Sequence, residues 1–587
     1  MKLIEYYIKL FIHFAKGVPD QPIKSSRTAV GEVIQCSERN VIHVLNKMEE
    51  RQWIKRTKGH GRGNITLIHF LKSLEEMFKF YEENAPTYKD IEKLVSLLEE
   101  SSILTGKKQL FDSLLTNLFG LKMSVQPSEK EEYDSLRIPY FRSILSLDPS
   151  QIERQTERHL VGQLFTTLVT YNKDENIVKP AISHHWERSK DGKVWTFYLR
   201  KGVRFHNERL LEAEDVQFTF DRLRETPSRW IVRHLEKITC IGKHVVQFHF
   251  TIPNLCWDTL LCSPKCSVIP FKYGGKSPEE FSKHPIGTGP YKIKEHHDQF
   301  LSLAVHQSFF QERAHIDEIE IFVLPTIQKY LHVNKTDQGS IFYIPFTTEV
   351  ETPSPLHDID RKHLSVKYLM WNVSKENIKS KPKLRKRVAE ILNRKRMVDE
   401  LGYPRYVATN SFIVMEEPSF LDVGQAYTSH EPLTLLTYDL TPHKEDIQWI
   451  QSECKAHGIR IEINTVPYVD FSREMKHADL VLSEYVIQEV SENALFNLFQ
   501  SETSVIRILS DQGRKARQDD LFEEALQSEK ENQLEVLKQI EQDLIDHDIV
   551  LPLYSTYQRA LHHEKLLGLS LNTLGLVPFK NLFYRKD

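Results

Sequence analysis

The sequence predicts a chain of several domains, in which a small helix–turn–helix module with a β-hairpin precedes a much larger α/β region. Three observations predict this fold class. The 587 residues are enough for roughly three to four domains of ordinary size. Positive charge is concentrated in the first 70 residues, although the whole chain is slightly acidic. From about residue 135 onward, short β-rich runs alternate with helical ones.

The composition is that of a packed globular protein. Hydrophobic residues make up 40% of the chain and charged residues 27%, which excludes an intrinsically disordered chain. The mean hydropathy is −0.43, and no apolar run is long enough to span a membrane. Six cysteines are too few for a disulfide framework and suit a reducing compartment.

The first fourteen residues predict a helix and not an export signal. Glu5 and Lys9 interrupt the apolar stretch, and no small-residue cleavage site follows. The apolar residues recur at helical spacing: Leu3, Tyr7, Leu10, Phe11 and Phe14. We therefore expect a first helix that packs on a core, and a cytoplasmic protein without membrane insertion.

The first 70 residues form a basic module. They hold twelve Lys and Arg against six acids, whereas the net charge of the whole chain is −3. Residues 28–35 predict a short helix, and Ser37 can cap a second one with Glu38 in its first turn. In that second helix Val41, Leu45 and Met48 face inward, and the opposite face carries Arg39, Asn40, His43 and Lys47.

A basic hairpin follows the second helix. Residues 55–63 read Lys-Arg-Thr-Lys-Gly-His-Gly-Arg-Gly, and a β-branched run follows them. Helix–turn–helix followed by a hairpin is the winged-helix pattern, in which the second helix enters the major groove of duplex DNA. Ser37 and the outward residues of that helix are the candidate base-reading side. We expect phosphate contacts from Lys55, Arg56, Lys58 and Arg62. The alternative is that these charged faces are only solvated.

This module resembles the N-terminal DNA-binding domain of SgrR-type transcriptional regulators. The resemblance is carried by residues 37–53 together with Gly61-Arg62-Gly63. It implies a domain over residues 1–120, with residues 72–120 as accessory helices. The polar stretch Gln126–Asp134 is the best linker candidate, so we expect a linker over residues 121–135.

The remaining chain resembles the family 5 extracellular solute-binding proteins. The motifs that carry the resemblance include Pro285–Tyr291 (PIGTGPY), Leu369–Asn372 (LMWN) and Val550–Tyr554 (VLPLY). The resemblance implies a solute-binding domain over residues 136–587, with two hinged α/β lobes, a ligand cleft and a second lobe at about 373–500. Independently, residues 433–466 predict a β-α-β unit. One departure is Glu208, where the family usually has glycine, and a left-handed turn is less favourable there without glycine.

The resemblance nominates Trp371, Asn372 and Tyr554 as ligand contacts, because strands at the lobe junction line such clefts. Packing is the alternative role for these side chains. Arg394 is a candidate partner for an anionic ligand, together with Arg385 and Arg387. The alternative is that the charged run over residues 379–396 is a solvated helix face.

No residue pattern predicts catalysis, a cofactor or a metal site. Cys256, Cys262 and Cys266 do not have a standard metal-ligand spacing. Residues 273–277 (YGGKS) resemble the end of a phosphate-binding loop, but a proline stands where its first glycine belongs. We therefore expect a protein that is not an enzyme and needs no cofactor.

Together these features predict a ligand-responsive transcriptional regulator. Its expected partners are double-stranded DNA and a small polar solute, such as a peptide or sugar derivative, and the chain is a possible homodimer. The alternative is a solute-binding receptor of a peptide- or nickel-type transporter, which the lack of an export signal disfavours.

Overall fold

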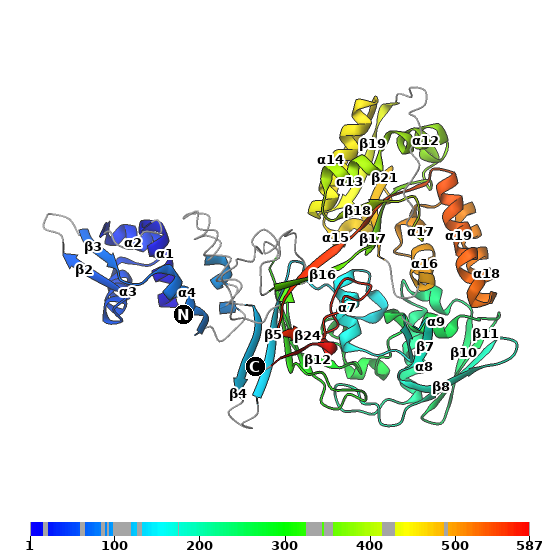
Figure 1. Cartoon of the computed structure of the whole chain (residues 1–587), viewed down its shortest axis with the longest axis horizontal. Helices are drawn as coiled ribbons and strands as arrows, with labels where there is room; N and C mark the ends of the chain where they lie inside the picture. Colours follow the sequence, from blue (N-terminus) through cyan, green and yellow to red (C-terminus); the bar gives the residue numbers. More distant parts are fainter. Residues whose placement is uncertain are drawn as a thin grey trace.

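The computed structural model describes residues 2–15, 22–58, 65–83, 89–90, 93–97, 119–125, 132–173, 175–324, 343–344, 356–413, 429–486 and 491–585. In Figure 1 the N-terminal module, in blue, lies apart from the rest of the chain, which forms two lobes. The lower lobe is mainly cyan and green, and the upper lobe mainly yellow and orange. The predicted fold class, a winged helix followed by a two-lobed α/β domain, is confirmed.

The N-terminal module is built around aromatic side chains. Rings of Tyr7 and Phe11 lie 5.2 and 5.0 Å from the ring of Phe70, so the first helix packs on a core, as predicted. The hairpin gains a third strand, and the order is β1-β3-β2 with both pairs antiparallel. The elements are α1 (Lys2–Leu10) with a π-helical turn (Phe11–Ala15), β1 (Ile23–Ser26), α2 (Arg27–Ile34), α3 (Glu38–Glu50), β2 (Ile54–Lys58), β3 (Ile65–Phe70) and α4 (Leu74–Glu83).

The expected linker is largely sheet. β4 (Gly120–Val125) pairs antiparallel with β5 (Glu132–Tyr140), and β5 pairs parallel with β14 (Glu318–Val323). Residues 126–131 lie outside the described part of the chain. The polar composition of this segment suits an edge hairpin as well as a linker, and its partner strand lies far away in sequence. The first lobe therefore begins at about residue 120.

Two sheets and the helices on them form the first lobe. The five-stranded sheet has the order β12-β13-β14-β5-β4, and the four-stranded sheet has the order β10-β11-β9-β8. The C-terminal end of the chain also packs here. The elements are α7 (Gln155–Leu164), β6 (Val169–Asn172), β7 (Ile177–Pro180), β8 (Ser183–Arg188), β9 (Val194–Leu199), α8 (Ala213–Leu223), β10 (Leu235–Ile241), β11 (Val245–Phe250), α9 (Trp257–Leu261), α10 (Pro278–Lys283), β12 (Tyr291–His297), β13 (Phe300–Val305), β24 (Leu566–Leu567) and β25 (Phe583–Tyr584).

A six-stranded sheet with the order β18-β22-β17-β21-β19-β20 forms the second lobe. This lobe spans about residues 365–556, wider than the expected 373–500, because its central strands β17 and β22 lie at the two ends of that range. Its elements are β17 (Ser365–Trp371), α11 (Glu376–Lys379), α12 (Pro382–Ile391), α13 (Arg394–Leu401), β18 (Arg405–Ala408), β19 (Ser429–Tyr438), α14 (Thr441–Ala456), β20 (Ile459–Val466), α15 (Tyr468–Glu474), β21 (Leu480–Val486), α16 (Ser491–Gln500), α17 (Val505–Leu509), α18 (Gln512–Gln527), α19 (Lys530–Asp546) and β22 (Val550–Thr556).

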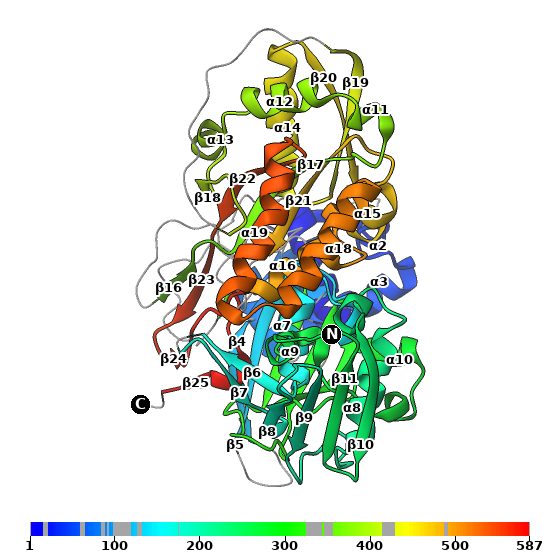
Figure 2. The same ribbon diagram turned by 90° about the vertical axis from the view of Figure 1, so that its right-hand side faces the viewer.

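Two chain segments join the lobes. β16 (Leu356–Arg361) leads into β17, and β22 leads into β23 (Gln558–His563); Figure 2 shows β16 and β23 running between the lobes. β16 and β23 pair antiparallel, so both connections belong to one ribbon. The predicted β-α-β unit is confirmed as β19, α14 and β20, whose two strands are parallel neighbours.

The charged run over residues 379–396 is not simply a solvated helix face. Arg385 and Arg387 are both buried. The guanidinium of Arg385 donates to the carbonyl oxygens of Ile378 and Lys379 at 3.0 and 3.1 Å. These carbonyls lie at the C-terminal end of α11, where a cation is favoured. The arginine in this helix therefore caps its neighbour.

The loop that departs from the family pattern keeps a left-handed turn. Glu208 has φ 65°, and its amide donates to the carbonyl of Phe205 at 2.8 Å. A residue with a Cβ atom is disfavoured in this conformation by about 1–2 kcal/mol. Glycine avoids this cost, but part of its advantage is offset because glycine gives the unfolded chain more conformational entropy. The turn thus forms at the expense of local strain.

Replacing Glu208 with glycine is expected to raise the free energy of unfolding by about 0.5–1 kcal/mol, because glycine removes this strain. Thermal unfolding of the full-length protein measures the effect as a higher midpoint for the first lobe. Gly202→Ala, at a residue with φ 90°, is the matched control and should lower the midpoint. An unchanged midpoint in Glu208→Gly would contradict the prediction.

Candidate functional site

Helix α3 presents the predicted polar face to solvent. Val41, Leu45 and Met48 are buried as predicted, together with Val44. Arg39, Asn40, His43 and Lys47 are exposed on the opposite side. Ser37 holds the N-cap position without a side-chain cap bond, while the Thr28 hydroxyl of α2 donates to the Glu38 carboxylate at 2.7 Å. The orientation of the four residues is confirmed, and their contact with DNA stays a prediction.

The basic residues of the wing differ in exposure and in hydrogen bonding. Lys55 is exposed on β2. Arg56 instead donates to the Glu49 carboxylate from Nε at 2.9 Å and to Asn46 Oδ1 from Nη2 at 2.6 Å. Although burial opposes ionisation of Glu49, the bonds from Arg56 lower its pKa. Arg56 therefore fastens the wing to α3. The side chain of Lys58 and all of Arg62 lie outside the described residues.

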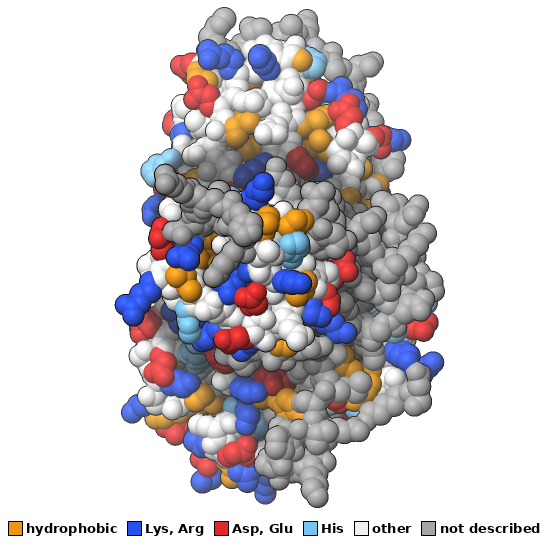
Figure 3. Space-filling view, turned by 90° about the vertical axis from the view of Figure 1, so that its left-hand side faces the viewer, with side chains coloured by type: hydrophobic (Ala, Val, Ile, Leu, Met, Phe, Trp, Pro, Cys, Tyr) orange, Lys and Arg blue, Asp and Glu red, His pale blue; other side chains and the backbone are white. Residues whose placement is uncertain are grey.

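Figure 3 shows the molecule from the side of the N-terminal module. Lys and Arg side chains are visible over the part nearest the viewer, interspersed with acidic side chains and with groups that are not described. Arg39 and Lys47 of α3 and Lys55 of β2 are exposed basic residues of this module. A cationic surface of this kind attracts the phosphate backbone of nucleic acid.

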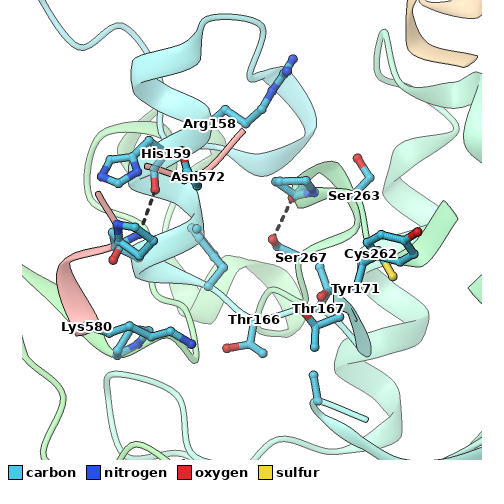
Figure 4. A pocket seen from close by; sticks show the side chains of 18 of the residues that line it. Arg158, His159, Thr166, Thr167, Tyr171, Cys262, Ser263, Ser267, Asn572 and Lys580 are labelled. Atoms are coloured by element: carbon cyan, nitrogen blue, oxygen red, sulfur yellow. Dashed lines mark hydrogen bonds between the residues drawn. The ribbon is translucent and has the colours of Figure 1, made fainter. Parts of the chain in front are cut away.

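A cavity of about 300 Å³ lies beside α7 in the first lobe. Figure 4 shows the side chains around it, with Arg158 and Lys580 at opposite ends. Among its described lining residues, these two carry formal charge and none is acidic. The other side chains that can hydrogen-bond with a solute are His159, Gln163, Thr166, Thr167, Thr170, Tyr171, Ser263, Ser267, Gln311, Asn493, Asn572 and Thr573. Asn493 comes from α16, so the second lobe contributes to the wall.

His159 is a neutral side chain in this wall. Neither of its ring nitrogens has a hydrogen-bond partner, and its ring packs edge-on against Phe579 with centroids 4.8 Å apart. Burial lowers the pKa of His159 to about 3. The imidazole is therefore uncharged at neutral pH, so the positive charge of this cavity comes from Arg158 and Lys580.

A second cavity, of about 250 Å³, lies between the lobes. The first lobe contributes Arg142, Glu153, Arg154 and Arg158. Four tyrosines of the second lobe face them: Tyr368, Tyr438, Tyr468 and Tyr485. The Arg154 guanidinium lies 5.4 Å from the Tyr468 ring centre and pairs with Glu157. Aromatic rings with polar ends suit a solute that has both a flat surface and hydrogen-bonding groups.

Glu484 connects this second cavity to a buried polar chain. The Lys367 ammonium lies 3.0 Å from the Glu484 carboxylate and 2.5 Å from His443 Nε2. Since Nε2 accepts from lysine, Nδ1 carries the proton and donates to the Thr437 hydroxyl at 2.8 Å. Burial opposes ionisation of Glu484, yet the charge of Lys367 holds its pKa well below the usual range. Burial and Lys367 together lower the pKa of His443 to about 3.

The expected ligand contacts lie in the core of the second lobe and line neither cavity. Trp371 is buried among apolar side chains, and the Asn372 amide donates to the carbonyls of Lys476 and Ala478 at 3.0 and 2.9 Å. The Tyr554 hydroxyl donates to Asp446 at 2.5 Å. Arg394 donates to two carbonyls, those of Thr409 and Pro552, at 3.3 and 3.1 Å. β17 and β22 are central strands buried on both faces, which explains why these positions are structural.

The cavities depend on residues that the sequence analysis did not single out. Arg158 and the four tyrosines lie on five different elements, so no local motif joins them. One signal was present: α7 is buried on almost every side, and an arginine in such a helix needs an explanation.

Two of the three clustered cysteines are core residues, and Cys262 is partly exposed. Cys256 and Cys266 are buried, and burial raises the pKa of Cys266 to about 12, which keeps that thiol protonated. Within the described ranges, no group of three or more His, Cys, Asp or Glu side chains is placed to hold a metal ion. A search of the same residues finds no helix both long enough and apolar enough to cross a bilayer.

Comparison with known proteins matches the two parts of the chain to two families. Residues 2–117 match the N-terminal domain of the sugar transport-related sRNA regulator, and residues 178–432 match the bacterial extracellular solute-binding proteins, family 5. The chain is 27% identical to YhjP of Bacillus subtilis over the full length of both proteins. It is 24% identical to the HTH-type transcriptional regulator SgrR of Yersinia enterocolitica, over 99% of this chain and 98% of that protein.

Solved structures share the fold of the large domain. A dipeptide-binding protein from a Pseudoalteromonas species, bound to Met-Leu, covers 77% of this chain with a TM-score of 0.65 at 17% identity, and the whole of that protein is matched. The binding protein AgaA from Agrobacterium tumefaciens, bound to agropinic acid, also covers 77% with a TM-score of 0.65, at 15% identity and over 99% of its own length.

Proposed function

The chain is a transcriptional regulator of the SgrR type, with a family 5 solute-binding domain, and we propose that it binds duplex DNA through α3 and the wing while the two-lobed domain senses a small polar solute. The observation that carries this proposal is the pairing of two surfaces on one chain. A polar and basic helix face is exposed at one end, and two polar cavities lie in and between the lobes.

The geometry of the N-terminal module supports the DNA-binding half. In a winged helix the second helix of the pair lies in the major groove, where arginine, asparagine and lysine side chains contact base edges and phosphates. α3 offers Arg39, Asn40, His43 and Lys47 on one exposed face, and Lys55 continues the cationic surface onto the wing. The bonds from Arg56 to Glu49 and Asn46 hold the wing and the helix together as one rigid surface.

The position of the cavities supports the sensing half. A solute in the cavity between the lobes contacts α7 of the first lobe and β21 of the second, so it favours the closed arrangement of the lobes. β4 and β5, which follow the DNA-binding module in sequence, belong to the sheet of the first lobe. We therefore propose that closure of the lobes acts on the module through this sheet.

The transport receptor is the second candidate function. The match of residues 2–117 to a regulator domain supports the sensor instead, since a receptor at the cell surface has no DNA to bind. A DNA partner also supports a cytoplasmic location. We propose no catalytic step, because the cavities offer binding groups without an activated nucleophile.

The test measures coupling between the two sites of the full-length protein. A DNA site is first selected from random duplexes, and solutes are found by thermal shift. A sensed solute is expected to change the affinity for the selected DNA by about 5–150-fold, and the DNA must change the affinity for the solute by the same factor. If a solute binds and leaves DNA affinity unchanged, the domains are only tethered and the proposed function is wrong.

A further inference from the structure

Arg158 lies where the two cavities meet. Among the described residues that line either cavity, it is the one that lines both. Its side chain leaves α7 at the edge of the first cavity, and Figure 4 shows the guanidinium extending away from His159 and Lys580. Arg158 therefore lies at the boundary of both cavities.

The charge of Arg158 has no matching carboxylate. Only 6% of the residue is exposed, and its guanidinium makes one long hydrogen bond, 3.4 Å from Nη2 to the carbonyl oxygen of Glu153. No described carboxylate lies within ion-pair distance of it. Burial lowers the pKa of Arg158, and this effect outweighs the attraction of the Glu153 carboxylate. A buried cation without a partner is costly, so such a site favours an anion.

The two carboxylates that line the second cavity, Glu153 and Glu484, already pair with other cations. Glu153 accepts hydrogen bonds from the Lys265 ammonium at 2.8 Å and from the Thr503 hydroxyl at 2.9 Å. Glu484 is bound by Lys367 and by the Ser365 hydroxyl. Both carboxylates thus pair with another cation, and neither lies within ion-pair distance of the Arg158 guanidinium, although the charge of Glu153 still acts on Arg158 from farther away.

Arg222 shows what a structural arginine looks like in the same lobe. Its two Nη atoms donate to the Asp148 carboxylate, both at 2.8 Å; the Asp148 side chain is buried and that of Arg222 is 9% exposed. A fork-to-fork pair of this kind is the usual partner of a buried guanidinium. Arg158 is buried to a similar degree and has the same guanidinium fork, but it borders two cavities and has no carboxylate paired with it among the described residues.

We propose that Arg158 binds the acidic group of a small organic anion, and that the solute sensed by this chain is a carboxylate or a phosphate ester and not a neutral compound. This inference rests on the proposed sensing function. A carboxylate or a phosphate satisfies the guanidinium fork with two parallel hydrogen bonds. The hydroxyl and amide groups of the first cavity, or the tyrosines of the second, bind the rest of the molecule.

The test uses calorimetric titration of the full-length protein at a fixed chloride concentration. Citrate is the carboxylate probe, glycerol 3-phosphate the phosphate probe and glycerol the neutral probe. We expect at least one anion to bind wild type, and Arg158→Gln to weaken it at least tenfold. Arg158→Lys keeps the charge without the fork and should also weaken binding. Binding of citrate would indicate recognition of a carboxylate, and binding of glycerol 3-phosphate would indicate recognition of a phosphate ester.

Two controls separate this site from other cations. Arg137→Gln removes a charge of the same lobe that pairs with Glu320 away from both cavities, and Lys237→Gln removes an exposed charge from β10. Both should leave anion affinity unchanged. If Arg158→Gln and Arg158→Lys bind the anions as tightly as wild type, or if glycerol binds and the anions do not, the inference is wrong. Anion binding that persists without any effect on DNA affinity would overturn the sensing function alone.

Discussion

Replacing Lys55, Lys58 and Arg62 together with glutamine is expected to weaken binding to every duplex DNA sequence by roughly two to three orders of magnitude at about 0.1 M salt. Each contact between a cation and a phosphate releases bound counterions, so each contributes about 0.9 to the slope of log affinity against log salt. Removing three contacts should lower that slope by about 2.7. Titrations of the full-length protein at several salt concentrations measure both quantities.

Matched variants show whether the effect belongs to the wing. Lys237→Gln removes an exposed lysine from β10 of the first lobe and should leave the salt slope unchanged. Asn40→Ala should instead lose about 1–3 kcal/mol at one base pair, with little change in slope. Arg56 is left out of the triple variant because it is bound to Glu49 and Asn46. A triple variant with the wild-type slope would exclude the wing as a phosphate-binding surface.

The sequence predicts the N-terminal module well because its elements are local. The inward and outward faces of α3 follow from helical spacing over thirteen residues, and the hairpin follows from glycines between two short runs. The β-α-β unit of the second lobe is equally local. The structure places Val41, Leu45 and Met48 inside and Arg39, Asn40, His43 and Lys47 outside, as the spacing requires.

What the sequence does not predict depends on distant pairing. The segment expected to be a linker becomes a sheet edge because β5 finds β14, about 180 residues away. The resemblance places Trp371 and Tyr554 in a cleft, but helices remote in sequence cover both faces of their strands. Arg158 could not be found from spacing, since the proposal for it rests on the lack of an ion-paired carboxylate among the described residues of the folded chain.

The largest effect on stability is expected from Lys367→Met, which should lower the free energy of unfolding of the second lobe by about 3–5 kcal/mol at neutral pH. The variant leaves the Glu484 carboxylate buried without its cation, and removes the donor to His443 Nε2. The loss is measured by urea unfolding that is monitored through hydrogen exchange of the backbone amides in β17 and β21. Lys375→Met is the control, because it breaks a partly exposed pair with Asp479 and should cost less.

The effect of Lys367→Met should depend on pH in a defined direction. In the wild-type protein the pKa of Glu484 is lowered on folding, so its contribution to stability is present above about pH 4.5 and is lost on acidification through the folded pKa. Without Lys367, burial dominates and raises that pKa, so the folded variant takes up a proton at Glu484 or at His443, 3.6 Å away. The variant then binds one proton more than wild type in the folded state.

Its deficit in unfolding free energy relative to wild type should therefore shrink by up to about 1.4 kcal/mol per pH unit on acidification from pH 7. A deficit that stayed constant between pH 7 and about pH 5 would show that Lys367 stabilises the lobe by packing and not by its charge.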